Sequence, residues 1–193
     1  MRPSGRIGKI FGWVMGRLNA GAYRWAVAQL EPAKPQNLLE IGFGTGDLLK
    51  LAARRLKPRR IAGVDPSELM LETARKKLRR FRKKAEIDLR LGDDSALPDG
   101  PFDAIVAAHC FQFWSDPHTT LQHLRAMLSP GGRLILVLRR HYSKGVANWI
   151  PNPLSHSGNE VSATIAAAQQ AGFVLKATAA ISKSSQGLAF ACG

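Results

Sequence analysis

The stretch Leu38-Leu39-Glu40-Ile41-Gly42-Phe43-Gly44-Thr45-Gly46 decides the fold of this chain. Its first residues, which are mostly apolar, predict a short buried strand, and the three glycines that follow predict a tight turn. Glycine permits a left-handed backbone and lets a ligand approach the main chain closely. A helix is expected from residue 47, so its first amide groups would face whatever the turn holds.

The spacing of these glycines separates two kinds of nucleotide-binding turn. The dinucleotide fingerprint G-x-G-x-x-G/A requires glycine or alanine at position 47. This chain has Asp47 there, and its third glycine, Gly46, comes one residue early. Because a carboxylate would repel a pyrophosphate, the pattern favours a ligand that need not contain phosphate.

The rest of the chain alternates between predicted strands and helices, which is typical of a parallel sheet covered on both faces. The short turn between the last two strands predicts that these two are antiparallel. We expect one α/β domain over residues 1–193, with a helical N-terminal cap segment at 1–30. Helices are expected at 19–30, 47–56, 68–84, 117–128 and 158–171, strands at 37–42, 60–65, 86–91, 102–107, 133–138, 173–181 and 187–192, and a hard turn at 129–132.

Acidic residues follow two of the predicted strands. Asp65 ends the second strand, about 20 residues beyond the glycine turn, where a carboxylate can accept both hydroxyl groups of a ribose. Asp93 and Asp94 follow the third strand. Each acid alone is as well explained by a turn or a helix cap. Because parallel strands end at one edge of a doubly wound sheet, their joint placement favours a single ligand site there.

Composition and charge restrict the function further. The chain has 193 residues and no apolar run long enough to span a bilayer. Its net charge is +14, and residues 50–84 carry 14 basic side chains against three acidic ones. Such a patch attracts nucleic acid, acidic lipid headgroups or acidic proteins. A solvated helix face explains it as well, so an acidic membrane surface or RNA remains an alternative partner.

The N-terminus and the cysteines favour a cytoplasmic protein. Residues 10–15 are apolar, but Arg17 interrupts them too early for a secretory signal. We expect an amphipathic helix, although the lack of acids before Glu31 also suits an organelle transit peptide. The two cysteines, Cys110 and Cys192, form no zinc-binding spacing and no disulfide framework, so we expect no metal.

Four segments together make this sequence resemble the class I S-adenosylmethionine-dependent methyltransferases, and within them the group that includes quinone and other small-molecule methyltransferases. The resemblance covers about residues 37–138 and implies a Rossmann-like seven-stranded sheet. The implied strand order is 3-2-1-4-5-7-6, with strand 7 antiparallel and helices on both faces. The segments are the glycine turn, Gly63-Val64-Asp65-Pro66-Ser67, residues 92–98 with Phe102-Asp103, and Leu128-Ser129-Pro130-Gly131-Gly132-Arg133-Leu134.

The resemblance also implies residue roles around an S-adenosylmethionine cofactor. The ribose hydroxyls would bind Asp65, and the adenine amino group would bind Asp93. The adenine ring would lie between Pro66 and Leu97 and contact the backbone of Asp94, while His109 would lie near the transferable methyl group. Position 94 is often small and apolar in the family, so this acid is a departure, and we expect it only to face solvent. The methionine part would be held by Glu40, Gly42, Gly44 and Gly46.

Candidates for a general base are His109, His141 and Tyr142, all of which follow strands that end at the active edge. His109 can instead only shape the cofactor pocket, and His141 can be a surface residue. Cys110 is a candidate nucleophile, but a small buried side chain is the simpler interpretation. An aromatic-walled pocket suits a flat or apolar substrate, although core packing explains Trp25 better. The aromatic residues near this edge are Phe111, Phe113, Trp114, Trp13, Tyr23, Trp25 and Trp149.

The sequence therefore predicts a methyltransferase for a small, apolar or aromatic acceptor. Residues 139–157, which match no familiar segment, are expected to act as a substrate lid. The alternatives are an RNA or protein methyltransferase that docks through residues 50–84, and a cofactor-binding module without activity. The asparagine-proline-proline-aromatic signature of DNA-base methylation is absent, because Ala108-His109-Cys110-Phe111 stands in its place. The sequence does not indicate an oligomeric state.

Overall fold

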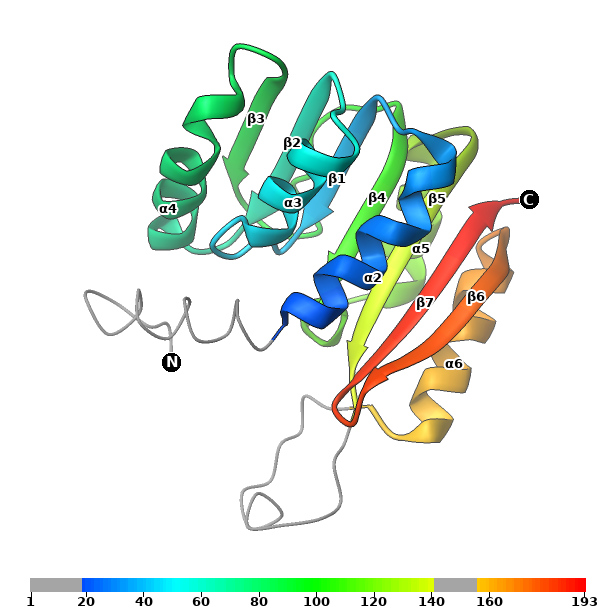
Figure 1. The fold of residues 1–193 in the computed structure, drawn as a ribbon. Coiled ribbons are helices and arrows are strands. Elements are labelled where there is room, and N and C mark those ends of the chain that lie inside the picture. The colour runs from blue at the N-terminus through cyan, green and yellow to red at the C-terminus, as the bar shows by residue number, and fades with distance from the viewer. Residues whose placement is uncertain (1–18, 141–155) are drawn as a thin grey trace, which may run out of the picture.

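The computed structural model describes residues 19–140 and 156–193 (Figure 1). Its centre is a seven-stranded sheet with the order β3-β2-β1-β4-β5-β7-β6. The pairs from β3 through β5 are parallel, whereas β7 runs antiparallel to both β5 and β6. The predicted strand order and the antiparallel seventh strand are thus confirmed. The strands are β1 (Asn37–Ile41), β2 (Arg60–Asp65), β3 (Glu86–Leu91), β4 (Phe102–Ala108), β5 (Leu128–Arg139), β6 (Phe173–Ser182) and β7 (Ser185–Cys192).

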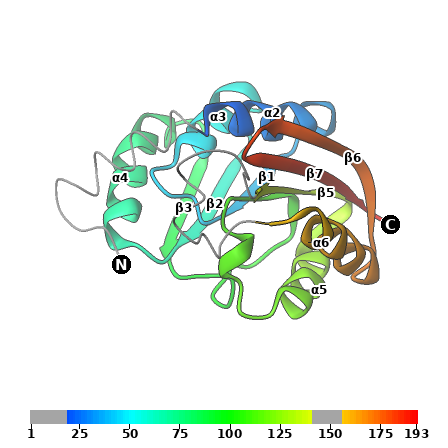
Figure 2. The same cartoon turned by 90° about the horizontal axis from the view of Figure 1, so that it is seen from below.

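Helices cover both faces of the sheet, as the alternation of elements predicts (Figure 2). One face carries α2 (Ala20–Leu30), α3 (Asp47–Arg55) and α4 (Glu68–Leu78), and the other carries α5 (Pro117–Met127) and α6 (Gly158–Gln170). Short 3₁₀ turns lie at Glu31–Ala33 (η1), Arg79–Phe81 (η2) and Phe111–Phe113 (η3).

The alternating side chains of the central strands divide the core into two layers. Along β1, Leu38 packs against α2, α3 and α4, whereas Leu39 and Ile41 pack against the layer of α5 and α6. Both layers are closed to water, since these three side chains are at most 3% exposed. Glu40 belongs by this alternation to the α3 face, so a carboxyl group enters an otherwise apolar layer.

Local sequence signals set the start of the helices that flank the ligand edge. Gly46 adopts a left-handed conformation (φ 75°) as the N-cap of α3. The Ser67 hydroxyl caps α4, and the Ser157 hydroxyl with Glu160 forms a capping box at α6, as its spacing predicts. Trp25 on α2 lies against Gly187 of β7, which agrees with the prediction of core packing for this residue.

Two predicted element boundaries are wrong. The helix expected over 68–84 ends at Leu78 and continues only as η2, because the last buried position of the stripe is Leu78 and almost every residue after it is polar and exposed. The hard turn expected at 129–132 lies within β5. That strand pairs with β4 at Leu128 and again from Arg133, so the intervening residues form a bulge.

No helix in residues 19–140 or 156–193 is both long enough and apolar enough to cross a bilayer. The N-terminal residues 1–18 lie outside the described part of the chain. Of the predicted N-terminal cap segment, residues 19–30 are described, and most of them form α2. This helix lies beside α3 and across β4, β5 and β7 on the sheet face (Figure 1).

Candidate functional site

Four loops meet at the carboxyl-terminal edge of the parallel strands, where they border a cleft of about 230 Å³. The parallel pairing of β1 through β4 explains the meeting, because these strands all end at the same edge. The cleft residues come from the end of β1 (Ile41, Gly42), from the end of β2 (Asp65, Pro66), from the loop after β3 (Gly92, Asp93, Asp94) and from the segment after β4 (His109, Cys110, Phe113, Trp114).

Asp65 joins the glycine turn to the start of α4. Its Oδ2 atom accepts a hydrogen bond from the Gly44 amide at 2.7 Å, and its Oδ1 atom accepts one from the Ser67 amide at 2.9 Å. The side chain is buried, and burial raises its pKa while the two amide donors lower it. Asp65 therefore fixes the turn without the help of a ligand.

All three glycines of the turn have a positive φ, and at two of them close packing also excludes a side chain. Gly42, with a φ of 70°, leaves no room for a Cβ atom, which would lie 2.7 Å from the Cβ of Cys110. Gly44, with a φ of 52°, would direct a Cβ atom into open space instead. Gly46 also has a left-handed backbone, and a Cβ atom there would lie 2.9 Å from the Cβ of Ala74. Close packing thus explains Gly42 and Gly46, and it does not explain Gly44.

Glu40 is a buried carboxyl group beside this turn. It is 2% exposed, and its Oε2 atom has no hydrogen-bond partner in the described residues. Burial, followed by the nearby charges of Asp65 and Asp47, raises its pKa well above the usual range, while the Leu49 amide has the opposite effect. An unpaired buried carboxyl oxygen costs free energy, so a cationic group placed there would be bound strongly.

Asp47 has its own partners at the start of α3. Its two oxygens bind the Nζ atom of Lys77 and the hydroxyl of Thr45, both at 2.7 Å. The acid that departs from the dinucleotide fingerprint thus ties the start of α3 to α4. Asp47 is not among the residues that line the cleft.

The two acids after β3 have different partners. Asp93 is exposed, and hydrogen bonds from the hydroxyl and amide of Ser95 lower its pKa. Asp94 accepts a hydrogen bond from the hydroxyl of Thr120 on α5 at 2.8 Å. The expectation that Asp94 only faces solvent is therefore wrong, because this half-buried side chain links the loop to α5. Leu97 packs against the α5 side of the core and does not line the cleft, whereas Pro66 does.

His109 has the most unusual backbone and side chain of the cleft. Its amide extends the ladder to Val137 at 2.8 Å, and its φ of 59° then turns the chain in a left-handed conformation that is rare outside glycine. Both ring nitrogens are buried and have no partner in the described residues. Burial, followed by the charge of Arg139, lowers its pKa to about 4, so the imidazole is neutral at physiological pH.

Phe111, Phe113 and Trp114 follow His109 and form an aromatic wall. The rings of Phe111 and Trp114 pack 4.8 Å apart between centroids, and both residues are buried. Phe113 lines the cleft and is 63% exposed, which is unusual for a large apolar side chain. The Nε1 atom of Trp114 and the Oε1 atom of Gln112 are buried without a partner in the described residues. This turn therefore combines apolar surface with unsatisfied polar atoms.

Cys110 is not placed as a nucleophile. Its thiol contacts the Ile41 carbonyl oxygen at 3.0 Å, and burial raises its pKa above the usual range. A neutral thiol is a poor nucleophile, so the structure favours the interpretation of Cys110 as a packing residue against Gly42.

The other two predicted bases, His141 and Tyr142, lie outside the described residues. The predicted lid over 139–157 is described only at its two ends. Arg140 and His156 form a β-bridge, and the His156 amide donates to the Arg139 carbonyl at 2.6 Å. The His156 ring lies 5.8 Å from that of Phe111, so both ends of this segment meet beside the aromatic wall.

Comparison with known proteins agrees with this geometry. A family model described as a methyltransferase domain matches residues 39–134, which contain the glycine turn and all the cleft loops. The chain belongs to the class I S-adenosylmethionine-dependent methyltransferases. The predicted family is therefore confirmed.

The relatives of this chain act, according to their names, on different acceptors. Demethylmenaquinone methyltransferase of Bacteroides fragilis is 31% identical over 116 residues, which are 59% of this chain and 47% of that protein. Malonyl-[acyl-carrier protein] O-methyltransferase of Priestia megaterium is 35% identical over 99 residues, or 51% and 35% of the two chains. This chain thus spans about half the length or less of these curated relatives.

A solved structure has the same fold over nearly the whole of this chain. Magnesium protoporphyrin IX methyltransferase from Synechocystis PCC 6803, solved with bound S-adenosylmethionine, superposes with a TM-score of 0.67 at 17% identity. The match covers 99% of this chain and 86% of that one.

The site fits S-adenosylmethionine, the cofactor of this methyltransferase family. Three features would suit three parts of the molecule: the unpaired buried Oε2 of Glu40 suits a cationic amino group, the open space at Gly44 admits a ligand against the backbone, and Asp65 suits a ribose. Within residues 19–140 and 156–193, no group of three or more histidine, cysteine, aspartate or glutamate side chains is placed to hold a metal ion.

Some residues near this site were not among those that the sequence assigned to it. Arg139, at the end of β5, acts electrostatically on both His109 and Tyr23. Burial and the charge of Glu40 raise the pKa of Tyr23 to about 12, and the Asn19 side chain bonds to it. The start of α2 therefore reaches the Glu40 side of the site. The sequence placed Tyr23 only in a segment near this edge, and no pattern identified Arg139 or Gln112.

Proposed function

We propose that this chain transfers the methyl group of S-adenosylmethionine to a small, apolar or aromatic acceptor. The observation that carries the proposal is the cleft itself, in which the ribose-binding candidate Asp65 and the neutral His109 share one space with an aromatic wall. S-adenosylmethionine supplies an electrophilic methyl group on a sulfonium. The protein then needs to align the acceptor, exclude water and accommodate a proton.

In this proposal, different residues of the chain bind different parts of the cofactor. Glu40 binds the amino group of the methionine part next to Gly42, Gly44 and Gly46. Asp65 binds the ribose hydroxyls with the oxygen lone pairs that its two amide donors leave free, and Pro66 packs on the adenine. Asp93 binds the adenine amino group, and the Asp94 backbone borders the ring. Leu97, which packs into the core, supports this loop.

The acceptor lies between His109 and the aromatic wall. A neutral imidazole with two unpaired ring nitrogens can accept a hydrogen bond from an acceptor hydroxyl or amino group and orient it toward the methyl group. The pKa of about 4 makes His109 a weak base, so we assign it to positioning in preference to proton removal. His141, Tyr142 and the lid over 139–157 are further proposals for the acceptor side.

The relatives support an acceptor of this class without identifying it. Their names state a quinone in one case and a carrier-bound malonyl group in another, and a porphyrin in the solved structure. Two of these three acceptors are flat and conjugated, which suits Phe113 and Trp114. We further propose a cytoplasmic location, which is consistent with two free cysteines.

The test is methyl transfer from radiolabelled S-adenosylmethionine by the purified chain. Acceptors would be a panel of quinols and phenols, porphyrin carboxylates and carrier-bound malonyl groups, with total RNA and a protein extract as separate arms. We expect label in a small aromatic acceptor. His109→Ala should raise KM for this acceptor, and His109→Gln, which keeps a hydrogen-bonding group, should restore part of the loss.

Two other outcomes would overturn the proposal. Label in RNA or protein, lost at high salt, would mean that the chain methylates a macromolecule docked through residues 50–84. Tight cofactor binding with no label in any arm would mean a cofactor-binding module without activity.

A further inference from the structure

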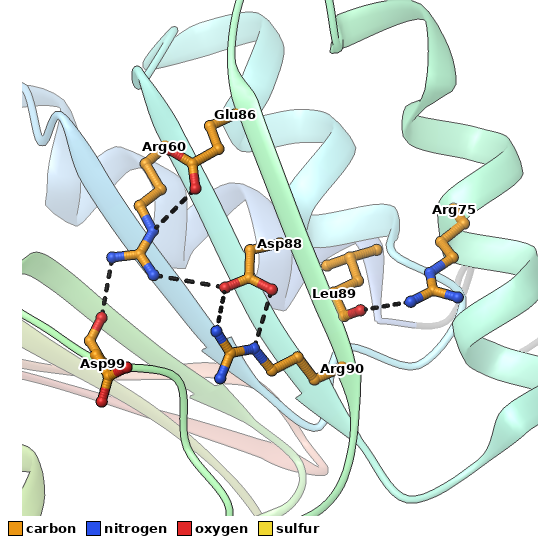
Figure 3. A network of polar contacts seen from close by, with 7 residues as sticks. All are labelled: Arg60, Arg75, Glu86, Asp88, Leu89, Arg90 and Asp99. Atoms are coloured by element: carbon orange, nitrogen blue, oxygen red, sulfur yellow. Dashed lines mark hydrogen bonds and ion pairs between the residues drawn. The ribbon is translucent and has the colours of Figure 1, made fainter.

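Two groups can be distinguished among the 14 basic side chains of residues 50–84. Some have structural partners, and Figure 3 shows two of them: Arg60 lies among Glu86, Asp88 and the Asp99 carbonyl, and Arg75 donates to a carbonyl of the edge strand β3. The pairs are Arg55 with Glu31 (2.9 Å), Arg60 with Asp88 (3.5 Å), Lys77 with Asp47 (2.7 Å) and Arg75 with the Leu89 carbonyl (2.9 Å).

The second group surrounds a pocket of about 380 Å³. Its charged lining comes from four separate positions: Arg54 at the end of α3, Lys57 in the loop after it, Arg80 in η2 and Lys84 before β3. All four are exposed, and none forms an ion pair within residues 19–140 and 156–193. The rest of the lining is apolar: Ala53, Pro58, Phe81 and Ala85.

No acidic residue of the described part of the chain lines this pocket, so no side chain in its lining offsets the repulsion among the four positive charges. The negative end of α3 offsets part of this repulsion, but that effect is confined to the last turn, whereas Arg80 and Lys84 belong to another segment. A concave surface with one sign of charge and an apolar floor concentrates the positive field. A ligand with two or more negative charges would relieve the repulsion that the fold leaves in place.

The pocket lies at the opposite edge of the sheet from the cofactor cleft. Both α3 and α4 start at loops of the cleft, and the pocket lies where α3 and the continuation of α4 end, one helix length or about 14 Å away. A membrane docked at the pocket would therefore not present an acceptor to the cleft. The pocket needs a separate ligand.

We propose that this pocket, lined by Arg54, Lys57, Arg80 and Lys84, is a second ligand site that binds a phosphate-bearing anion. Two arginines supply planar pairs of donors that match phosphate oxygens, and two lysines supply point charges. The full complement of four cations suits a diphosphate better than a single carboxylate. A soluble phosphate ester or a phospholipid headgroup could carry this chemistry.

The test uses calorimetric titration of the full chain with sodium pyrophosphate at fixed ionic strength. We expect saturable binding to one site, and we expect Arg54→Gln/Arg80→Gln to weaken it at least about tenfold. The matched control, Arg82→Gln/Lys83→Gln, removes the same charge from exposed residues outside the lining and should change the affinity less than about twofold. Both variants should bind S-adenosylmethionine as the parent chain does, so the outcome is independent of the proposed function.

Vesicles of phosphatidylcholine with and without phosphatidic acid distinguish the sources. Binding of pyrophosphate without vesicle binding supports a soluble ligand, and vesicle binding that requires both phosphatidic acid and the two arginines supports a headgroup. Equal loss of affinity in the two variants would show only general charge attraction and overturn the site. Absence of binding to pyrophosphate and to vesicles would overturn it as well, as would binding of single-stranded RNA that both variants weaken equally.

Discussion

Asp65 shows how one carboxylate can serve both the fold and the ligand. Its oxygens already accept hydrogen bonds from the Gly44 and Ser67 amides, each oxygen has a further lone pair, and Asp65 lines the cleft. In the proposed function, the same acid therefore shapes the turn that would receive the methionine part and would bind the ribose beside it. A substitution should affect affinity through both contributions.

We expect Asp65→Ala to weaken S-adenosylmethionine binding at least about tenfold by calorimetry, because hydrogen bonds to a charged group are lost. Asp103→Ala is the matched control. Its Oδ2 atom also accepts two backbone amides, those of Gln36 and Asn37 (2.8 and 2.9 Å), but at the other end of β1. This control should lower the melting temperature and leave the affinity unchanged. Unchanged affinity in Asp65→Ala would show that the ribose assignment is wrong.

The buried Glu40 carboxyl group lowers the stability of the ligand-free fold at neutral pH. Because its pKa in the fold is raised, the folded chain holds this proton more tightly than the unfolded chain does. The contribution of Glu40 to stability is therefore complete below about pH 4.5 and is lost as the pH rises through the raised pKa. At neutral pH the buried carboxyl destabilises the fold until a cation compensates it.

Glu40→Gln should consequently raise the melting temperature at pH 7 and weaken S-adenosylmethionine binding roughly tenfold or more. Binding to the parent chain should also release a proton, which titrations in buffers of different ionisation enthalpy would detect. Methylthioadenosine, which lacks the amino acid part, serves as the control and should bind both chains alike. If Glu40→Gln is less stable than the parent chain, Glu40 is compensated by the fold alone.

At the scale of elements, the turn between β1 and α3 separates packing from ligand binding. Gly42→Ala brings a Cβ atom to 2.7 Å from the Cβ of Cys110, whereas Gly44→Ala meets no atom of the described residues within 4 Å. Both positions have a positive φ, so each substitution carries a strain of roughly 1–2 kcal/mol. Only Gly42→Ala adds a steric clash to that strain.

We therefore expect Gly42→Ala to lower the free energy of unfolding clearly more than Gly44→Ala in urea titrations. Gly44→Ala should weaken S-adenosylmethionine binding nevertheless, since its methyl group would enter the space where the cofactor approaches the backbone. If Gly44→Ala binds the cofactor normally, the open space at this turn belongs to no ligand.

Most helices and strands were predictable from the sequence, and both errors occur where the tertiary environment overrides a local sequence preference. Buried strands such as β1 and β2 are short apolar runs between turn residues, and the capping box at Ser157 marked α6. The end of α4 was missed because helix-forming residues continue after Leu78, although of residues 79–84 only Phe81 packs against the core. The bulge in β5 was missed because Pro130 and the two glycines after it predict a turn, and neighbouring strands allow them inside a strand.

The sequence predicted the residues of the candidate site only where they lie at or directly after the end of a strand. Asp65, Asp93 and His109 follow three different strands, and parallel pairing alone brings them to one cleft. The partners of these residues were not predictable, because they depend on side-chain directions across the sheet. Thr120 reaches Asp94 from α5, and Arg139 acts on His109 from β5.

At the scale of the whole molecule, the cofactor site couples the first four strands of the sheet. Residues proposed to bind S-adenosylmethionine follow β1, β2, β3 and β4, and Gly46 and Ser67 on the same loops cap α3 and α4. Unfolding of any of these elements would dismantle the site. The cofactor therefore binds only the folded chain and should stabilise it as a unit.

We expect S-adenosylmethionine at about 100 times its Kd to add about 2.7 kcal/mol to the free energy of unfolding. For a chain of this length that corresponds to a rise in melting temperature of roughly 5–11 °C. NADH should cause no such rise, because the turn lacks the third glycine of the dinucleotide fingerprint and places Asp47 at that position. A thermal shift with NADH equal to that with S-adenosylmethionine would contradict the cofactor assignment, since the same loops would then hold a pyrophosphate. The Asp65→Ala variant provides the internal check, because a tenfold weaker affinity reduces the added free energy to about 1.4 kcal/mol, roughly half, at the same cofactor concentration.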